Sequence, residues 1–146
     1  MKHLSTAIAL ALCATTLPTA VLAEGPKVFE QAKINAGQAL FDAECRRCHA
    51  DNAQDASYGP PLENIIGRGA GTYPGFDYST ALAASGIVWT EAALRAWMED
   101  NTGFMPGTRM RHVGIEERAV QDFILSYLRA ITTRDGAAIT DDLSKD

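Results

Sequence analysis

Cys45 and Cys48 stand three positions apart in the chain, and His49 follows the second cysteine directly. Two cysteines at this spacing with an adjacent histidine form the attachment signature of c-type haem. The two sulfurs are placed to form thioethers with the vinyl groups of the haem, and His49 to bind its iron. This motif constrains the fold more than any other feature, because the chain must enclose a large, flat, apolar ring.

Two other kinds of site use a Cys-x-x-Cys pair. A redox-active disulfide of this type favours a βαβ context, and the sequence shows no convincing strand alternation. A structural zinc site usually needs four ligands. After residue 23 the chain holds two cysteines and two histidines, and His112 has no metal-ligand spacing to the cysteines. Haem attachment is therefore the interpretation that the sequence favours.

The first 23 residues have the pattern of a secretory signal peptide. Lys2 and His3 form a short positive start, residues 4–17 are mostly apolar, and small or apolar residues precede a cleavage site after Ala23. An uncleaved membrane anchor is the alternative. Such an anchor needs about 20 continuous apolar residues, and Pro18 and the neighbouring threonines interrupt the run. Cleavage predicts export to the periplasm, with no stable membrane insertion afterwards.

The remainder of the chain is long enough for one domain, which we place at residues 24–132. All 18 acidic residues lie after residue 23, against 12 of the 13 lysines and arginines, so this part carries a formal net charge of −6. That charge excludes the basic footprint of a nucleic-acid-binding protein. Residues 133–146 are polar, contain four aspartates and are expected to form an acidic tail in solvent.

Apolar residues recur at three- and four-residue steps in residues 26–44 and 116–132, and this pattern predicts two amphipathic helices. Two shorter helices are predicted at residues 79–85 and 90–100. Gly37 lies in the middle of the first pattern, where a glycine costs about 1 kcal/mol relative to alanine. We expect it to let helix 116–132 cross closely. The alternative is a glycine that is merely tolerated.

Long loops rich in glycine and proline connect these segments. Loops of this length count against a compact domain. A haem resolves the difficulty, because loops can fold around the ring as the centre of the core. The sequence therefore predicts an all-α fold of about four to five helices, with long loops wrapped around one covalent haem.

A methionine sulfur is the sixth ligand in low-spin electron-transfer haems of this kind. Met98 lies at helical spacing behind Leu94 and is expected to pack in the core. Met105 and Met110 flank one irregular loop. Met105 precedes Pro106, which favours extended backbone, whereas Met110 lies in a stretch able to direct a side chain inward. From the residues alone, ordinary packing remains the alternative for each methionine.

The chain resembles the class I c-type cytochromes, in particular the mitochondrial cytochrome c and bacterial periplasmic branch. The resemblance runs from about Gly37 to Leu128, and it implies the small cytochrome c fold and one covalent haem c. The residues that carry it are Gly37 with Phe41, Cys45-Arg46-Arg47-Cys48-His49, Gly59-Pro60-Pro61-Leu62, Gly67-Arg68, Pro74-Gly75-Phe76-Asp77-Tyr78, Gly86-Ile87-Val88-Trp89, Pro106-Gly107-Thr108-Arg109-Met110 and Tyr127-Leu128.

The resemblance also implies how the haem is held. Cys45 and Cys48 would carry the thioethers, and His49 and Met110 would be the axial ligands of the iron. The backbone carbonyl of Pro60 would accept a hydrogen bond from the second ring nitrogen of His49. A bond of this kind fixes the tautomer and the ring orientation of a metal-bound histidine.

Further roles around the ring follow from the same resemblance. Tyr78 and Trp89 would donate hydrogen bonds to the haem propionates, with Arg68 nearby to offset their charge. The alternatives are ordinary core aromatics and a solvated arginine. Trp97 stands where mitochondrial relatives have a tyrosine that bonds to the methionine ligand, so that bond is in question here. Leu82 replaces a frequent asparagine, so a leaner polar network is expected.

These observations predict a soluble, exported monohaem carrier of single electrons between redox partners, with no catalysis by this chain alone. A second hypothesis is a dedicated cytochrome subunit docked on a periplasmic dehydrogenase or oxidase. A third is a haem enzyme or gas sensor with an open coordination position, which a methionine ligand at Met110 argues against. The sequence does not identify the electron donor or acceptor.

The partners of mitochondrial relatives meet lysines around the haem edge, but lysine is scarce in this chain. Five arginines lie in or beside the stretches expected to wrap the ring: Arg46, Arg47, Arg68, Arg109 and Arg111. We call them the arginine collar. Local charge of this kind can steer a partner even when the net charge is negative. The alternative is five scattered, solvated arginines.

Overall fold

The computed structural model describes residues 25–52, 55, 57–134 and 137–138, so the predicted signal peptide lies outside the described residues. Four helices and two short strands form there, and the all-α prediction is confirmed. In chain order they are α1 (Gly25–Glu44), α2 (Thr80–Ala83), α3 (Glu91–Phe104), α4 (Arg118–Ala130), β1 (Thr133–Arg134) and β2 (Ala137–Ala138). No helix among the described residues is long and apolar enough to cross a membrane.

The helix ends follow local capping and backbone geometry. Thr90 caps α3 with its side chain, which accepts a hydrogen bond from the Ala93 amide at 3.1 Å. α4 begins at Arg118, two residues after its predicted start, because the backbone of Glu117 is still extended. α3 continues past its predicted end, but Asp100 interrupts it with non-helical backbone angles. The predicted end of that helix therefore coincides with a real break.

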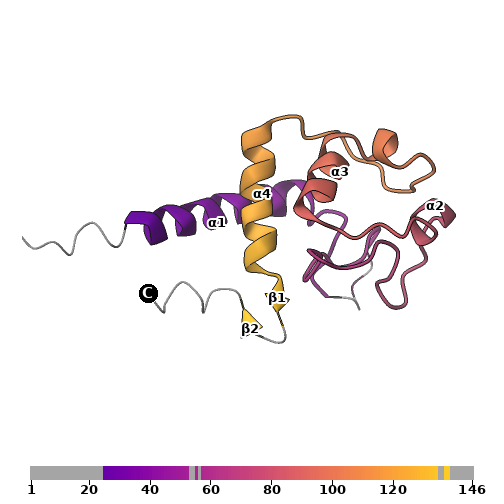
Figure 1. Ribbon diagram of the computed structural model, residues 1–146, viewed down its shortest axis with the longest axis horizontal. Coiled ribbons are helices and arrows are strands. Elements are labelled where there is room, and N and C mark those ends of the chain that lie inside the picture. The colour runs from indigo at the N-terminus through magenta and orange to yellow at the C-terminus, as the bar shows by residue number, and fades with distance from the viewer. Residues whose placement is uncertain (1–24, 53–54, 56, 135–136, 139–146) are drawn as a thin grey trace, which may run out of the picture.

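α1 and α4 cross on one side of the molecule, while α2, α3 and the loops lie on the other (Figure 1). Gly37 lies at the crossing. A Cβ atom there would stand 1.9 Å from the carbonyl oxygen of Phe123 and 3.0 Å from the Cβ of Tyr127. Only glycine allows this approach, so the predicted close crossing is confirmed. Phe41, one helical turn further along α1, is fully buried against the ring of Tyr127.

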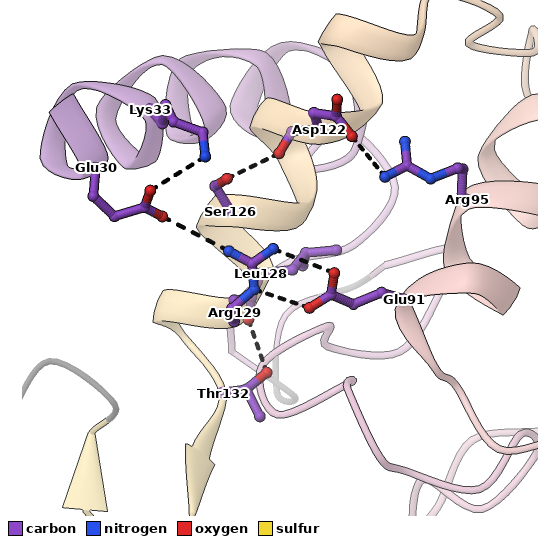
Figure 2. Close-up of polar contacts among 9 residues, drawn as sticks. All are labelled: Glu30, Lys33, Glu91, Arg95, Asp122, Ser126, Leu128, Arg129 and Thr132. Atoms are coloured by element: carbon purple, nitrogen blue, oxygen red, sulfur yellow. Dashed lines mark hydrogen bonds and ion pairs between the residues drawn. The ribbon is translucent and has the colours of Figure 1, made fainter. Parts of the chain in front are cut away.

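Two arginines join α4 to its neighbours, as Figure 2 shows. Arg129 donates two hydrogen bonds to the Glu91 carboxylate at the start of α3, at 2.9 and 3.2 Å, and lies 3.7 Å from Glu30 of α1. Arg95 of α3 pairs with Asp122 of α4 at 2.6 Å. Partly exposed pairs of this kind contribute modestly to stability. These pairs connect α4 to both α1 and α3.

The buried apolar core lies among α1, α3, α4 and the loops that precede α3. Its members include Ile65, Leu82, Trp89, Trp97, Met98, Met105, Ile124, Leu125 and Leu128. The loops are tied to one another by backbone hydrogen bonds, such as those between Gly67 and Trp89 and between Trp89 and Arg68, each 2.9 Å. Cys45 and Met110 are partly buried and pack against this same core.

Beyond α4 the chain forms two short strands, which were not predicted from the sequence. β1 and β2 pair as an antiparallel ladder, with Thr133 opposite Ala138 and Arg134 opposite Ala137. The expectation that the polar tail lies in solvent stays a prediction. The rest of the predicted tail, 135–136 and 139–146, lies outside the described residues.

Candidate haem site

The Cys-x-x-Cys-His motif continues the direction of α1 as one further helical turn. The amides of Cys45 and Arg46 donate to the carbonyl of Phe41, at 2.8 and 3.2 Å, and the amides of Cys48 and His49 donate to that of Cys45, at 3.0 Å each. This turn leaves Cys45 half-buried and Cys48 exposed, with both thiols free. Burial raises the pKa of the Cys45 thiol to about 12.

His49 is buried, and Gly59 and Pro60 of the following loop fix the orientation of its ring. Its Nδ1 lies 2.7 Å from the Pro60 carbonyl oxygen, and because a carbonyl can only accept, Nδ1 carries the proton. Nε2 is then the nitrogen with a free lone pair. Burial lowers the pKa of the ring, which favours the neutral form that a metal requires. The predicted bond between His49 and Pro60 is confirmed.

Gly59 forms the floor beneath this imidazole. A Cβ atom on Gly59 would lie 2.3 Å from Cε1 and 2.5 Å from Nδ1 of His49. The Gly59 amide also donates to the Cys48 carbonyl at 2.8 Å. Glycine is required at residue 59, because no side chain fits between this backbone and the imidazole ring.

The partly buried side chain of Arg46 forms hydrogen bonds within the protein. Its Nη1 donates to the His49 carbonyl at 3.3 Å, and its Nη2 donates to Glu63 Oε1 at 2.5 Å. The guanidinium also lies over the ring of Phe41, 4.7 Å from the centroid. Arg46 thereby links the haem-binding turn to the loop that carries Pro60. Its guanidinium is partly buried and already paired, and its membership in the arginine collar stays a prediction.

Arg68, Tyr78 and Trp89 lie along the loops around the core. Arg68 donates to the carbonyls of Pro61 and Glu63, at 3.0 and 3.3 Å, and burial lowers its pKa. Tyr78 lies within electrostatic range of Arg68, and burial raises the pKa of its phenol. Trp89 is 6% exposed. The structure brings Arg68 and Tyr78 together, while the roles of all three toward propionates remain predictions.

The sulfur of Met110 accepts a hydrogen bond from the indole nitrogen of Trp97, and the two atoms are 3.0 Å apart. The sequence left this bond in question because the relatives use a tyrosine. The indole N–H of Trp97 thus makes a hydrogen bond to this sulfur. Met98 and Met105 are only 8% and 7% exposed and belong to the apolar core. The prediction that Met98 packs in the core is confirmed.

Two polar residues hold the backbone of Met110, and sequence reasoning missed both. Thr108 Oγ1 accepts from the Met110 amide at 3.3 Å, and Asn101 Nδ2 donates to the Met110 carbonyl at 2.9 Å. Both side chains are buried. Asn101 lies one residue beyond the predicted helix 90–100, so only its spacing of four residues from Trp97 could have indicated it.

The rest of the arginine collar is divided. Arg109 forms an ion pair with Asp77 at 3.1 Å and also bonds to its carbonyl oxygen. Arg47 and Arg111 are exposed. Because Arg46 and Arg68 are partly buried and hydrogen-bonded within the protein, the exposed Arg47 and Arg111 are the collar members best placed to meet a partner.

The residues present fit a covalently attached haem. A neutral, oriented imidazole, a glycine floor beneath it and two thiols on one helical turn match the donor set of a c-type haem. Apolar and aromatic side chains surround Cys45 and Met110. Cys45, Cys48 and His49 would hold the group, which supplies a one-electron couple.

The comparisons with known proteins agree with this geometry. A sequence model of the family described as cytochrome c matches residues 34–132. Cytochrome c type-1 of Ascaris suum is 34% identical over 98 residues, which cover 67% of this chain and 88% of that protein. Cytochrome c2 of Rhodopila globiformis is 36% identical over 95 residues, which cover 65% and 90%.

Among solved structures, cytochrome cH from Methylobacterium extorquens matches with a TM-score of 0.59 and 35% identity, over 65% of this chain and 95% of that one. The family match spans both candidate ligands and all four helices except the first part of α1. The protein is thus an electron carrier with one covalent haem c, and not an enzyme. The chain belongs to the cytochrome c family, as a class I c-type cytochrome.

Proposed function

We propose that this protein is a soluble, exported carrier of single electrons between periplasmic redox proteins, with His49 and Met110 as the axial ligands of its haem iron. One observation carries the proposal: each of these side chains is already held at one atom by a hydrogen bond within the protein. His49 is held at Nδ1 by Pro60, and Met110 is held at its sulfur by Trp97.

Each hydrogen bond leaves the ligand with a free lone pair that can bind the iron. His49 binds metal through Nε2, because its Nδ1 proton is committed to the Pro60 carbonyl. Met110 has two lone pairs on sulfur and gives one of them to the indole of Trp97. Ligands fixed in this way need little rearrangement when an electron is gained or lost. Low reorganisation is what a carrier requires.

Cys45 and Cys48 form the two thioethers in this proposal, and Arg68, Tyr78 and Trp89 face the propionates. Arg68 suits that role because it is half-buried and makes its hydrogen bonds to backbone carbonyls. No salt bridge among the described residues engages its guanidinium, although the Glu63 carboxylate lies within electrostatic range. Tyr78 and Trp89 each supply one donor in the same part of the fold.

The axial assignment is tested by replacing Met110 and, as a matched control, Met105. Met110→Ala should abolish the weak long-wavelength band that marks a methionine–iron bond in ferric haem. It should also lower the reduction potential, because methionine ligation raises it. Met105→Leu conserves volume in the core and should leave both readouts intact. Loss of the band in Met105→Leu alone would transfer the role to Met105.

Export and the free-carrier role have direct tests. The mass of the purified protein should match a chain that begins after Ala23, and an intact N-terminus would support the uncleaved anchor. The holoprotein should run alone on gel filtration, whereas co-purification with a dehydrogenase or oxidase would support a dedicated subunit. Carbon monoxide should bind the reduced protein poorly, because Met110 fills the sixth position.

A further inference from the structure

α3 is interrupted at Asp100, where the backbone leaves the helical region (φ −152°, ψ 90°). The Asp100 carboxylate then caps the short helical turn that follows. It accepts hydrogen bonds from the Gly103 amide at 2.8 Å and from the Thr102 hydroxyl at 2.9 Å. A Cβ on Gly103 would lie 2.1 Å from Asp100 Oδ2. The sequence therefore specifies the interruption by a capping residue and a glycine.

The interruption makes backbone groups at the end of the first part of α3 available to another segment. In a continuous helix the carbonyl of Met98 would accept from residue 102. Here it accepts from the amide of Ile115 at 2.8 Å. Gly114 approaches so closely that a Cβ there would lie 2.2 Å from the carbonyl oxygen of Glu99. Residues 110–115 are thus fastened to α3 at their far end.

Asn101 fastens the near end of the same segment. It is the first residue after the interruption and is 3% exposed. Its side-chain amide donates to the Met110 carbonyl at 2.9 Å, and its own carbonyl accepts from the Met105 amide at 3.0 Å. A buried carbonyl that loses its donor costs more than an exposed one. The Met110 carbonyl therefore takes its hydrogen bond from a side chain of α3, while the Met110 amide is held by Thr108 of the same loop.

We propose that Asn101 is a positioning residue for Met110, and that the interruption at Asp100 exists to place it. The inference rests on the proposed function, in which Met110 is an axial ligand. Asn101 acts only through the Met110 backbone, while Trp97 acts on the sulfur. Removing the amide of Asn101 should leave the sulfur, the indole and the apolar core in place. Met110 should then leave the iron more often.

The test uses added imidazole as a competing ligand for the ferric holoprotein. Imidazole binds only when methionine has left, so its apparent affinity reports the fraction of open molecules. One buried hydrogen bond shifts such an equilibrium by roughly two- to ten-fold. Asn101→Ala should therefore bind imidazole about two- to ten-fold more tightly than the native protein, with the methionine–iron band still present in the absence of imidazole.

A matched control separates positioning from general destabilisation. Ser126→Ala removes another buried hydrogen bond from a side chain to a backbone carbonyl, that of Asp122 at 2.9 Å within α4. It should leave imidazole affinity unchanged. Asn101→Leu keeps the volume of the site without the donor and should match Asn101→Ala, so it decides if the alanine variant does not fold. Equal affinity in the Asn101 variants and the native protein would overturn the proposal.

The native holoprotein offers a measurement that needs no variant of Asn101. Its side-chain amide protons should exchange slowly with solvent and should lose protection when imidazole saturates the iron. Protection that imidazole does not change would contradict the proposal. Failure of the proposed function has a different signature, because Met110→Ala would then keep the methionine–iron band whatever Asn101 does.

Discussion

Replacing Gly37 by alanine tests how closely α1 and α4 must approach. The crossing places the Gly37 Cα against the backbone of Phe123, and an added Cβ would lie only 1.9 Å from that carbonyl oxygen. Contacts of this kind are essentially never shorter than 3.0 Å, so the helices must separate locally by about 1.1 Å. The obstructing atom belongs to a helix backbone, which cannot rotate away as a flexible side chain would.

The size of the effect follows from two opposing contributions. Alanine gains about 1 kcal/mol over glycine in a helix interior. Overpacking a well-packed contact costs about 1–3 kcal/mol or more, and a backbone clash belongs at the upper end of that range. Separation also loosens the contact between Phe41 and Tyr127, whose ring centroids are 5.2 Å apart. We expect Gly37→Ala to lower the free energy of unfolding by about 2 kcal/mol.

Urea unfolding of the oxidised holoprotein, followed by far-ultraviolet circular dichroism, measures this change. The midpoint reports stability provided that the slope of the transition is unchanged. Gly25→Ala is the control, because it adds the same methyl group to the same helix with nothing within 4 Å. Its midpoint should stay the same or rise slightly. A Gly37→Ala midpoint equal to or above the native value would refute the close-crossing argument.

Two further predictions concern charge. The hydrogen bonds from Arg129 lower the pKa of Glu91, so their contribution to stability is complete above the ordinary value of 4.5 and is lost as the pH falls through the folded-state pKa. Glu91→Gln should lower the urea midpoint at neutral pH but not in strong acid, and an equal loss at both would contradict this. If Arg47 and Arg111 steer anionic partners, the rate of oxidation by ferricyanide should fall with added salt, because about 0.1 M salt screens charges beyond roughly 10 Å. Replacing both by glutamine should flatten this dependence, and a native rate that rises with salt would show that the net charge of −6 dominates.

Features of the fold that depend on short-range patterns were predictable from the sequence. The apolar periodicity of α4 and the glycine in the middle of α1 predicted that these two helices cross closely. The capping residue Thr90 predicted the start of α3. The start of α4 was misplaced by two residues because acidic side chains before it resemble a first helical turn. The pairing of β1 with β2 was not predicted, because the polarity of residues 133–146 indicated an irregular tail.

Pairings between distant residues were harder to predict from the sequence. The bond of His49 to Pro60 came from family resemblance, and no spacing rule alone gives it. The pairing of Arg46 with Glu63 was not predicted, because the two residues lie 17 positions apart and no short-range pattern links them. Asn101 was missed because the predicted helix ended at residue 100, and the kink that buries its amide is not shown by apolar periodicity.

Both candidate ligands are held by a hydrogen bond between a side chain and a backbone carbonyl. On the His49 side, the helical turn that follows α1 ends, and the Pro60 carbonyl in the next loop accepts a hydrogen bond from the imidazole ring. On the Met110 side, the break in α3 provides an amide, that of Asn101, which binds the ligand backbone. In both places a regular helix stops, and a side-chain N–H donates a hydrogen bond to a backbone carbonyl of another segment. Orientation of the ligands is thus a consequence of how the helices end, and changes at those ends should alter ligation before they alter the fold.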